Sequence, residues 1–347
     1  MNKKAILVCS ALLALAGIMS SAQVKADDLP AGMTAGNTVS ITKKVFVYNR
    51  KQSAKVNAKR KALINAQNEL SALKGKIKGD ELATGGASGF FQEIAESSGM
   101  SEAQKNDAAT AYAVVNGQID APSWYDQYVN LGQASDATSV KNLYATLPYY
   151  DQYIKIRQKY NLNVPQVSLA DVAVAMMDAD YSTHVIDHTR HYNADENLAW
   201  NVSDDPNSLW MSEESIWKKG VKKNPSLAQY RNDGYGLSQV DHNFFEQVGH
   251  YLNLTDPATQ SYGFGLNTEH HKYDDTESWD AGYGESAFSV DEFKQLVTDY
   301  YNKIEQPDQV KTAQNKVKAA KKALAKAKKA DKKKAVKKVR RARKVKR

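Results

Sequence analysis

The sequence predicts an α+β protein, in which one mixed domain is flanked by two long helices. Residues 168–180 form a strongly apolar run behind a capping serine, which indicates a buried helix. Residues 249–254 and 262–266 have the composition of two strands separated by a turn. Apolar residues recur every seven positions near both ends of the chain, which indicates helices that pair along a seam. The 347 residues leave room for one domain with extensions.

Residues 1–26 have the pattern of a signal peptide. Two lysines precede an apolar run over residues 5–19, and small residues stand before Asp27, where cleavage is expected. The run is short for an uncleaved membrane anchor, which is the alternative. Its removal would also remove Cys9, the only cysteine, so a disulfide scaffold is excluded for the mature chain. We therefore expect a secreted protein with no transmembrane segment after cleavage.

The region before the main domain divides into three parts. Residues 27–49 show only broken alternation and are expected to be an extended linker. Residues 50–79 predict a coiled-coil helix, and residues 80–136 a helical linker region. The coiled-coil seam consists of Val56, Leu63, Leu70 and Ile77.

The main domain is expected over residues 137–305. Its first helix is predicted over residues 137–161, and its second is the apolar run that ends at Asp180. Ser289 and Glu292 form a capping box that begins the last helix, over residues 289–304.

Residues 306–347 predict a Lys/Arg-rich helical tail. Val310, Val317 and Leu324 repeat the seven-residue spacing, so the tail is expected to pair with residues 50–79, within one chain or between chains. Residues 311–347 hold nineteen basic residues and one acid, a net charge of +18, whereas residues 1–310 carry −10. This asymmetry predicts a polyanionic partner for the tail. Export argues against nucleic acid, and cell-wall polyanions such as teichoic acid fit better.

Two histidines and two glutamates form the candidate site: His191, Glu196, Glu213 and His250. Imidazole and carboxylate groups are usual ligands of zinc. The four residues are unequally spaced, so only tertiary folding can bring them together.

The motifs around these residues resemble those of the CAP superfamily (cysteine-rich secretory, antigen 5 and pathogenesis-related proteins). "HYNADENLAW", "WMSE" and "GHYLNL…YGFG" stand in the order found there and look most like the surface exclusion-like proteins of Gram-positive lactic acid bacteria. The resemblance covers roughly residues 140–270. It implies a three-layer α-β-α sandwich with the four polar residues in an open cleft, where the histidines can hold a divalent metal such as zinc.

The resemblance also selects between neighbouring residues. His191 keeps the five-residue step to the glutamate of "ENLA", and His188 is the alternative. Glu213 stands three residues after Trp210 and is preferred to Glu214. Asp195 replaces the glycine that usually precedes this glutamate, so the local turn is expected to differ.

Three function classes follow. The first is a surface protein that mediates or limits cell-surface contacts, as surface exclusion proteins are thought to do. The second is a metal-dependent hydrolase or peptidase acting at the cell wall, with Glu196 or Glu213 as general base. The third is a lipid or sterol binder. The sequence has neither a nucleophilic serine motif nor an HExxH helix, so the first class ranks highest.

Overall fold

A computed structural model describes residues 35–202 and 204–344 of the chain. Helices dominate and a small sheet of four strands is present, so the predicted α+β class is confirmed. The predicted signal peptide lies outside the described residues. The described residues divide into two compact units, one within residues 68–315 and the other made of residues 35–67 with 316–344. No helix of the described residues is both long and apolar enough to cross a membrane.

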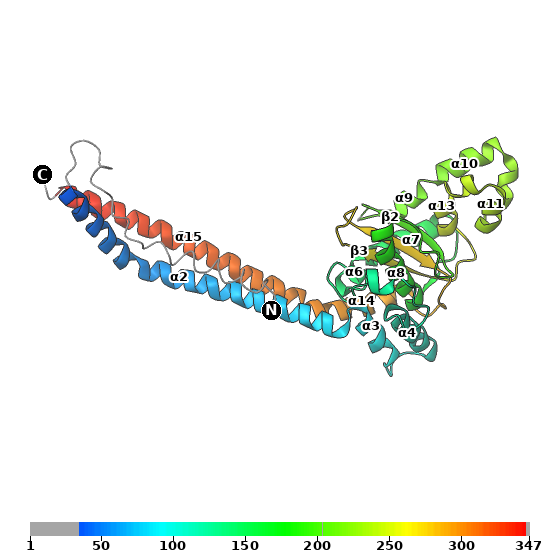
Figure 1. Cartoon of the computed structure of the whole chain (residues 1–347), viewed down its shortest axis with the longest axis horizontal. Coiled ribbons are helices and arrows are strands. Elements are labelled where there is room, and N and C mark those ends of the chain that lie inside the picture. Colours follow the sequence, from blue (N-terminus) through cyan, green and yellow to red (C-terminus); the bar gives the residue numbers. More distant parts are fainter. Residues whose placement is uncertain (1–34, 203, 345–347) are drawn as a thin grey trace. The chain divides into compact units, whose positions relative to one another are not determined.

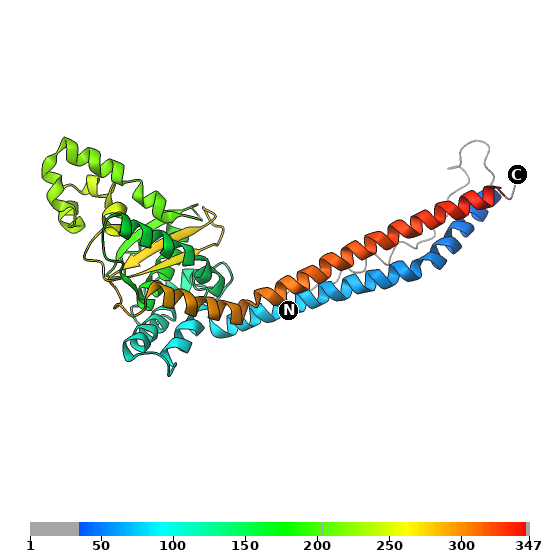
Figure 2. The same ribbon diagram turned by 180° about the vertical axis from the view of Figure 1, so that it is seen from behind.

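The smaller unit contains parts of the two longest helices, α2 (Ala35–Thr84) and α15 (Pro307–Lys344). Residues 35–67 and 316–344 run side by side in this unit (Figures 1 and 2). Helix α2 begins at Ala35, so residues 35–49 are helical and not extended as predicted. The alternation in that segment is short, and no proline interrupts it, so the helix continues through it.

The larger unit is built around the sheet, whose strand order is β1-β3-β4-β2. Strands β1 and β3 are parallel, and the other two pairs are antiparallel. The strands are β1 (Gln166–Val167), β2 (Asp195–Trp200), β3 (Ser261–Asn267) and β4 (Thr276–Ala281).

Helices pack on both faces of strand β3. Its large side chains contact helix α7 (Leu147–Lys159), with the rings of Tyr150 and Phe264 4.9 Å apart. The alternate positions on the other face are glycines, and a Cβ atom at Gly265 would lie 2.1 Å from the carbonyl oxygen of Ala175 in helix α8 (Leu169–Val185). The absence of side chains here allows α8 to lie directly on the strand.

Further helices surround this centre. The single helix predicted over residues 137–161 is divided at Thr146, because Pro148 begins a new helix. The predicted serine N-caps at Ser168 and Ser289 are confirmed, and Ser101 caps the helix that begins at Glu102. The remaining elements are α3 (Ala87–Ala95), α4 (Glu102–Val115), α5 (Tyr125–Tyr128), α6 (Val140–Ala145), α9 (Pro206–Met211), α10 (Glu214–Lys223), η2 (Pro225–Tyr230), α11 (Gly234–Val240), α12 (His242–Phe245), α13 (Gly249–Leu254) and α14 (Val290–Glu305).

Residues 249–254 form helix α13, so the predicted strand there is wrong. The antiparallel neighbour of β3 is β4, which follows it in sequence. A short apolar run does not distinguish helix from strand. Here the run packs into a second apolar cluster with helices α10 and α11, where Trp217 and Leu237 meet Tyr251 and Leu252.

Candidate functional site

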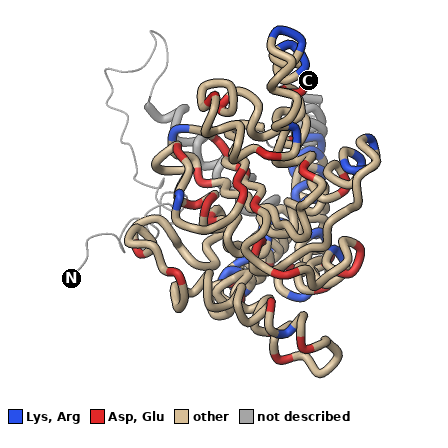
Figure 3. Tube along the Cα trace, turned by 90° about the vertical axis from the view of Figure 1, so that its right-hand side faces the viewer, with Lys and Arg blue, Asp and Glu red and all other residues tan. Residues whose placement is uncertain are grey.

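The larger unit contains a cavity of about 830 Å³. One wall comes from the segment between α8 and β2, and the other comes from helices α11 to α13 and their connections. Such a volume is in the range of ligand-binding pockets, roughly 300–1,000 Å³. Asp and Glu residues occur along many separate segments of the trace (Figure 3). The described lining includes seven carboxyl side chains and one guanidinium, that of Arg190, so the cavity is strongly acidic.

The first His–Glu pair joins His188 to Glu196. Helix α8 ends where Ile186 adopts a left-handed backbone conformation (φ 60°), which leads His188 out to the cavity. Its Nδ1 lies 2.7 Å from Oε2 of Glu196 on strand β2. This hydrogen bond raises the pKa of His188 above its ordinary value. The other carboxylate oxygen of Glu196, Oε1, is buried and has no hydrogen-bond partner in the protein.

The second pair joins His250 of α13 to Glu213, which stands at the start of α10. The Nδ1 atom of His250 lies 2.6 Å from Oε1 of Glu213, and the Tyr251 N–H donates to Oε2 at 3.1 Å. Trp210 fixes this region to the sheet, because its Nε1–H donates to the Leu198 carbonyl at 2.9 Å. His250 lines the cavity. Glu213 lies outside the lining and contacts the Nδ1 side of the His250 ring.

Asn197 connects the two pairs. It follows Glu196 in strand β2, and its side-chain N–H donates to the carbonyl oxygen of His250 at 3.1 Å. Asn253 donates in turn to the Asn197 side-chain oxygen at 3.0 Å. The asparagine of "ENLA" therefore holds the strand that carries one pair against the helix that carries the other.

His191, the histidine preferred from the sequence, does not line the cavity. Its Nε2 lies 2.7 Å from the carbonyl oxygen of Asp120, at an exposed position. Arg190, which lies between the two histidines, has a positive φ of 52°. The alternative, His188, takes the place assigned to His191. The five-residue spacing to Glu196 therefore does not identify the histidine that contacts this glutamate.

Two buried carboxyl groups at the cavity were missed from the sequence. Asp178 of α8 lines the cavity while only 2% exposed, and Asp280 of β4 is fully buried close to it. Burial is the largest cause that raises the pKa of each well above its ordinary value, and the neighbouring carboxylates add to it. An acid within the apolar run 168–180 was the available signal, since buried acids rarely lack a structural or chemical role.

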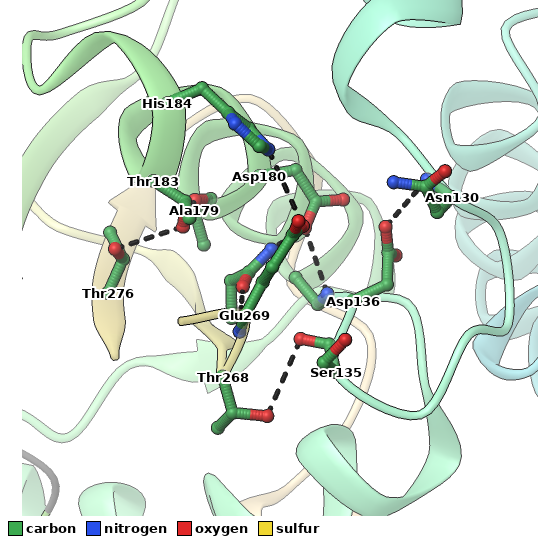
Figure 4. Close-up of polar contacts among 12 residues, drawn as sticks. Asn130, Ser135, Asp136, Ala179, Asp180, Thr183, His184, Thr268, Glu269 and Thr276 are labelled. Atoms are coloured by element: carbon green, nitrogen blue, oxygen red, sulfur yellow. Dashed lines mark hydrogen bonds and ion pairs between the residues drawn. The ribbon is translucent and has the colours of Figure 1, made fainter. Parts of the chain in front are cut away.

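A second buried polar cluster, shown in Figure 4, is separate from the cavity lining. Asp180 accepts hydrogen bonds from the Ala137 N–H at 2.9 Å and from Asn267 at 2.7 Å. Asp136 accepts from the Asn130 N–H at 2.6 Å. Nearby, His184 stacks on Tyr128 with ring centroids 4.9 Å apart. This cluster fixes the segment before α6 to α8 and to the end of β3.

The histidines at the cavity fit a weakly held metal. In each ring Nδ1 faces a glutamate, an arrangement that orients imidazole ligands in metal sites. Within the described residues, neither Nε2 atom takes part in a hydrogen bond, and no group of three or more His, Cys, Asp or Glu side chains is arranged to hold a metal. A metal here would thus take two protein ligands and draw the others from solvent or a bound ligand.

No family model matches the sequence, and it matches neither a curated protein nor a solved structure.

Proposed function

We propose that this chain is a secreted or wall-associated surface protein of CAP type, which mediates or limits cell-surface interactions through its cleft. The observation that carries the proposal is the pairing of His188 with Glu196 and of His250 with Glu213, with both histidines at one cavity. Glu196, Glu213 and His250 belong to the motifs on which the resemblance rests, whereas His188 precedes the first motif by three residues. Helices α7 and α8 on opposite faces of the sheet further support the three-layer α-β-α sandwich.

In this proposal the cleft holds a divalent metal such as zinc through His188 and His250. Glu196 and Glu213 orient the two rings and increase their basicity. The two-histidine set leaves coordination positions open, which suits a site where a metal helps to hold a ligand. The Lys/Arg-rich segment 311–347 supplies noncovalent attachment to wall polyanions such as teichoic acid.

A zinc titration of the full mature chain, followed by calorimetry, tests the cleft. His188→Ala and His250→Ala should each weaken zinc binding at least about tenfold, since each removes half of the protein's ligand set. His191→Ala is the matched control, because this ring lies outside the cavity lining, and it should leave the affinity unchanged. Equal loss in all three variants, or no loss in the first two, would refute the assignment.

A metal-dependent hydrolase acting at the wall is the second candidate. Glu196 favours it, because its carboxylate lies beside His188 in the cavity lining and could act as a general base on water. Incubating the zinc-loaded chain with wall fragments and peptides distinguishes the two. Metal-dependent cleavage lost in both His188→Ala and His250→Ala would establish the hydrolase, whereas binding without cleavage supports the surface protein. The charged lining offers no support for a lipid or sterol ligand.

A further inference from the structure

Both helices of the smaller unit are strongly basic. Residues 316–344 of α15 contain sixteen Lys or Arg and a single acid, Asp331, whereas residues 35–67 of α2 contain eight Lys or Arg and no acid. The described part of this unit therefore carries a net charge of +23, and one third of its basic residues belong to α2. These two segments are called the basic helix pair below.

The basic side chains of the pair are open to solvent on both helices. All ten lysines between residues 316 and 334 of α15 are exposed. On α2, the basic residues between positions 54 and 67 are also all exposed, and they are Lys55, Lys59, Arg60 and Lys61. Since the two segments run side by side, these charges of α2 lie along the same element as those of the tail (Figure 1). At 1.5 Å per residue, residues 316–344 extend over about 44 Å.

The apolar contact between the two helices is small. Ala66, Val317 and Ala327 are buried, whereas Leu63 and Leu324 are only half-buried. Small apolar side chains bury little area and so contribute little to stability. Repulsion among many like charges opposes the pairing of these helices. A polyanion that neutralises charges on both helices would bind the paired state preferentially and thereby stabilise it.

The exposed surface of the pair favours a linear polymer over a lipid membrane. A helix that binds a membrane surface needs an apolar face to bury in the lipid. Among residues 54–67 and 316–334, Ile64 is the only large hydrophobic side chain that is exposed. The pair therefore offers extended positive charge without an apolar face, which suits a polymer with a charge on each repeating unit.

We propose that the wall polyanion, a linear polyphosphodiester of the teichoic acid kind, binds along the basic helix pair and contacts α2 as well as the tail. The inference deepens the proposed function, on which it rests for the class of partner, by adding a second helix to the attachment surface. Residues 35–67 thereby have a binding role besides pairing with the tail.

Neutralising the basic residues of α2 tests this role in the full mature chain. The variant combines Lys55→Gln, Lys59→Gln, Arg60→Gln and Lys61→Gln. Glutamine has a helix propensity close to that of lysine, so α2 should persist, which circular dichroism checks. Affinity for purified teichoic acid at low salt should fall about tenfold or more. The slope of log affinity against log salt should become shallower by roughly three, since each neutralised phosphate contributes about 0.7–0.9.

Two matched variants, each lacking four positive charges, show where the binding surface lies. The first is on the tail and should weaken binding as the α2 variant does: Lys326→Gln, Lys328→Gln, Lys329→Gln and Lys332→Gln. The second replaces exposed lysines of α10 in the larger unit and should leave the affinity unchanged: Lys218→Gln, Lys219→Gln, Lys222→Gln and Lys223→Gln.

The outcomes separate this inference from the proposed function. Wild-type binding by the α2 variant, with weaker binding by the tail variant, would overturn the inference and keep attachment through the tail. Wild-type binding by both would remove the inference and the tail attachment together. Equal loss in the α10 control would show that binding follows net charge, which also overturns the inference.

A lipid comparison tests the choice of polymer. Vesicles of phosphatidylglycerol and phosphatidylcholine, supplied at the same phosphate concentration as the teichoic acid, should bind the wild-type chain at least about tenfold more weakly. Equal or tighter binding to the vesicles would contradict the assignment of a linear polyanion.

Discussion

At the scale of single residues, the buried carboxyl groups of Asp136 and Asp180 determine how one part of the fold responds to pH. Asp180 is fully buried, and burial, reinforced by the charge of Asp136, raises its pKa well above the ordinary value. A carboxyl group whose pKa is higher in the folded chain stabilises the fold below its unfolded pKa of about 3.9. That stabilisation is lost as the pH rises through the folded value.

Asp180→Asn should therefore be no less stable than the wild type at pH 8, and should show a smaller loss of stability with rising pH. The amide keeps an oxygen for the Ala137 and Asn267 donors but cannot ionise. Asp180→Ala, in contrast, should lower the free energy of unfolding by about 2–4 kcal/mol, because both donors lose their acceptor. Urea denaturation at several pH values measures both. If the Asn variant is as unstable as the Ala variant, the pKa of Asp180 does not control this response.

At the residue level, the sequence motifs single out side chains that the structure brings close together. Glu196, Glu213 and His250 belong to such motifs, and the structure places them in two His–Glu pairs. His191 lies outside the cavity lining, and the positive φ of Arg190 beside it is not visible in the residue types. Asp178 is not identified from the sequence, because the pKa of its carboxyl group depends on burial and on Glu196 and Asp280, which are distant from it in sequence.

At the scale of elements, the contact between β3 and α8 depends on two glycines. A Cβ atom at Gly263 would lie 2.2 Å from the backbone nitrogen of Val172, as close as the one at Gly265 to its neighbour. Both neighbours are backbone atoms of α8 and cannot rotate away. Helix α8 also contributes Asp178 to the cavity lining, so this contact positions that part of the lining.

Gly265→Ala should destabilise the chain by about 1–3 kcal/mol or more, since the methyl group forces α8 away from the strand. Gly79→Ala is the matched control: no atom lies within 4 Å of its Cβ position in α2, and alanine there should stabilise the helix by about 0.5–1 kcal/mol. Thermal unfolding followed by circular dichroism compares the two. A tolerated Gly265→Ala would show that the helix–strand contact is not closely packed.

The elements that the sequence predicted correctly have strong local signals. The serine caps and the long apolar run predicted α8 and α14. The segment 249–254 was mistaken because six residues are too few for periodicity to separate strand from helix, and its contacts with Trp217 and Leu237 decide the outcome.

At the scale of the whole molecule, charge is divided between an acidic majority of the chain and a basic tail, −10 against +18. We propose that the two parts have different partners: a cation for the cleft and a wall polyanion for the tail. Only electrostatic binding of the tail should depend steeply on salt through release of counterions from the polyanion.

Truncation after residue 330 tests the role of the tail. It removes eleven of the nineteen basic residues of segment 311–347 and keeps the seam through Ala327, so the helix pairing should survive. Retention on purified teichoic acid at low salt should fall severalfold or more, and its salt dependence should become shallower. Retention equal to that of the full chain would rule out the tail as the attachment segment.

The central claim is that His188 and His250 form one site with their glutamates. Crystals of the full mature chain grown with zinc, measured on both sides of the zinc absorption edge, test it most directly. The account predicts an anomalous peak at the cavity within bonding distance, roughly 2.0–2.1 Å, of Nε2 of both rings. A peak on His191, or no peak at either cavity histidine under saturating zinc, would contradict it.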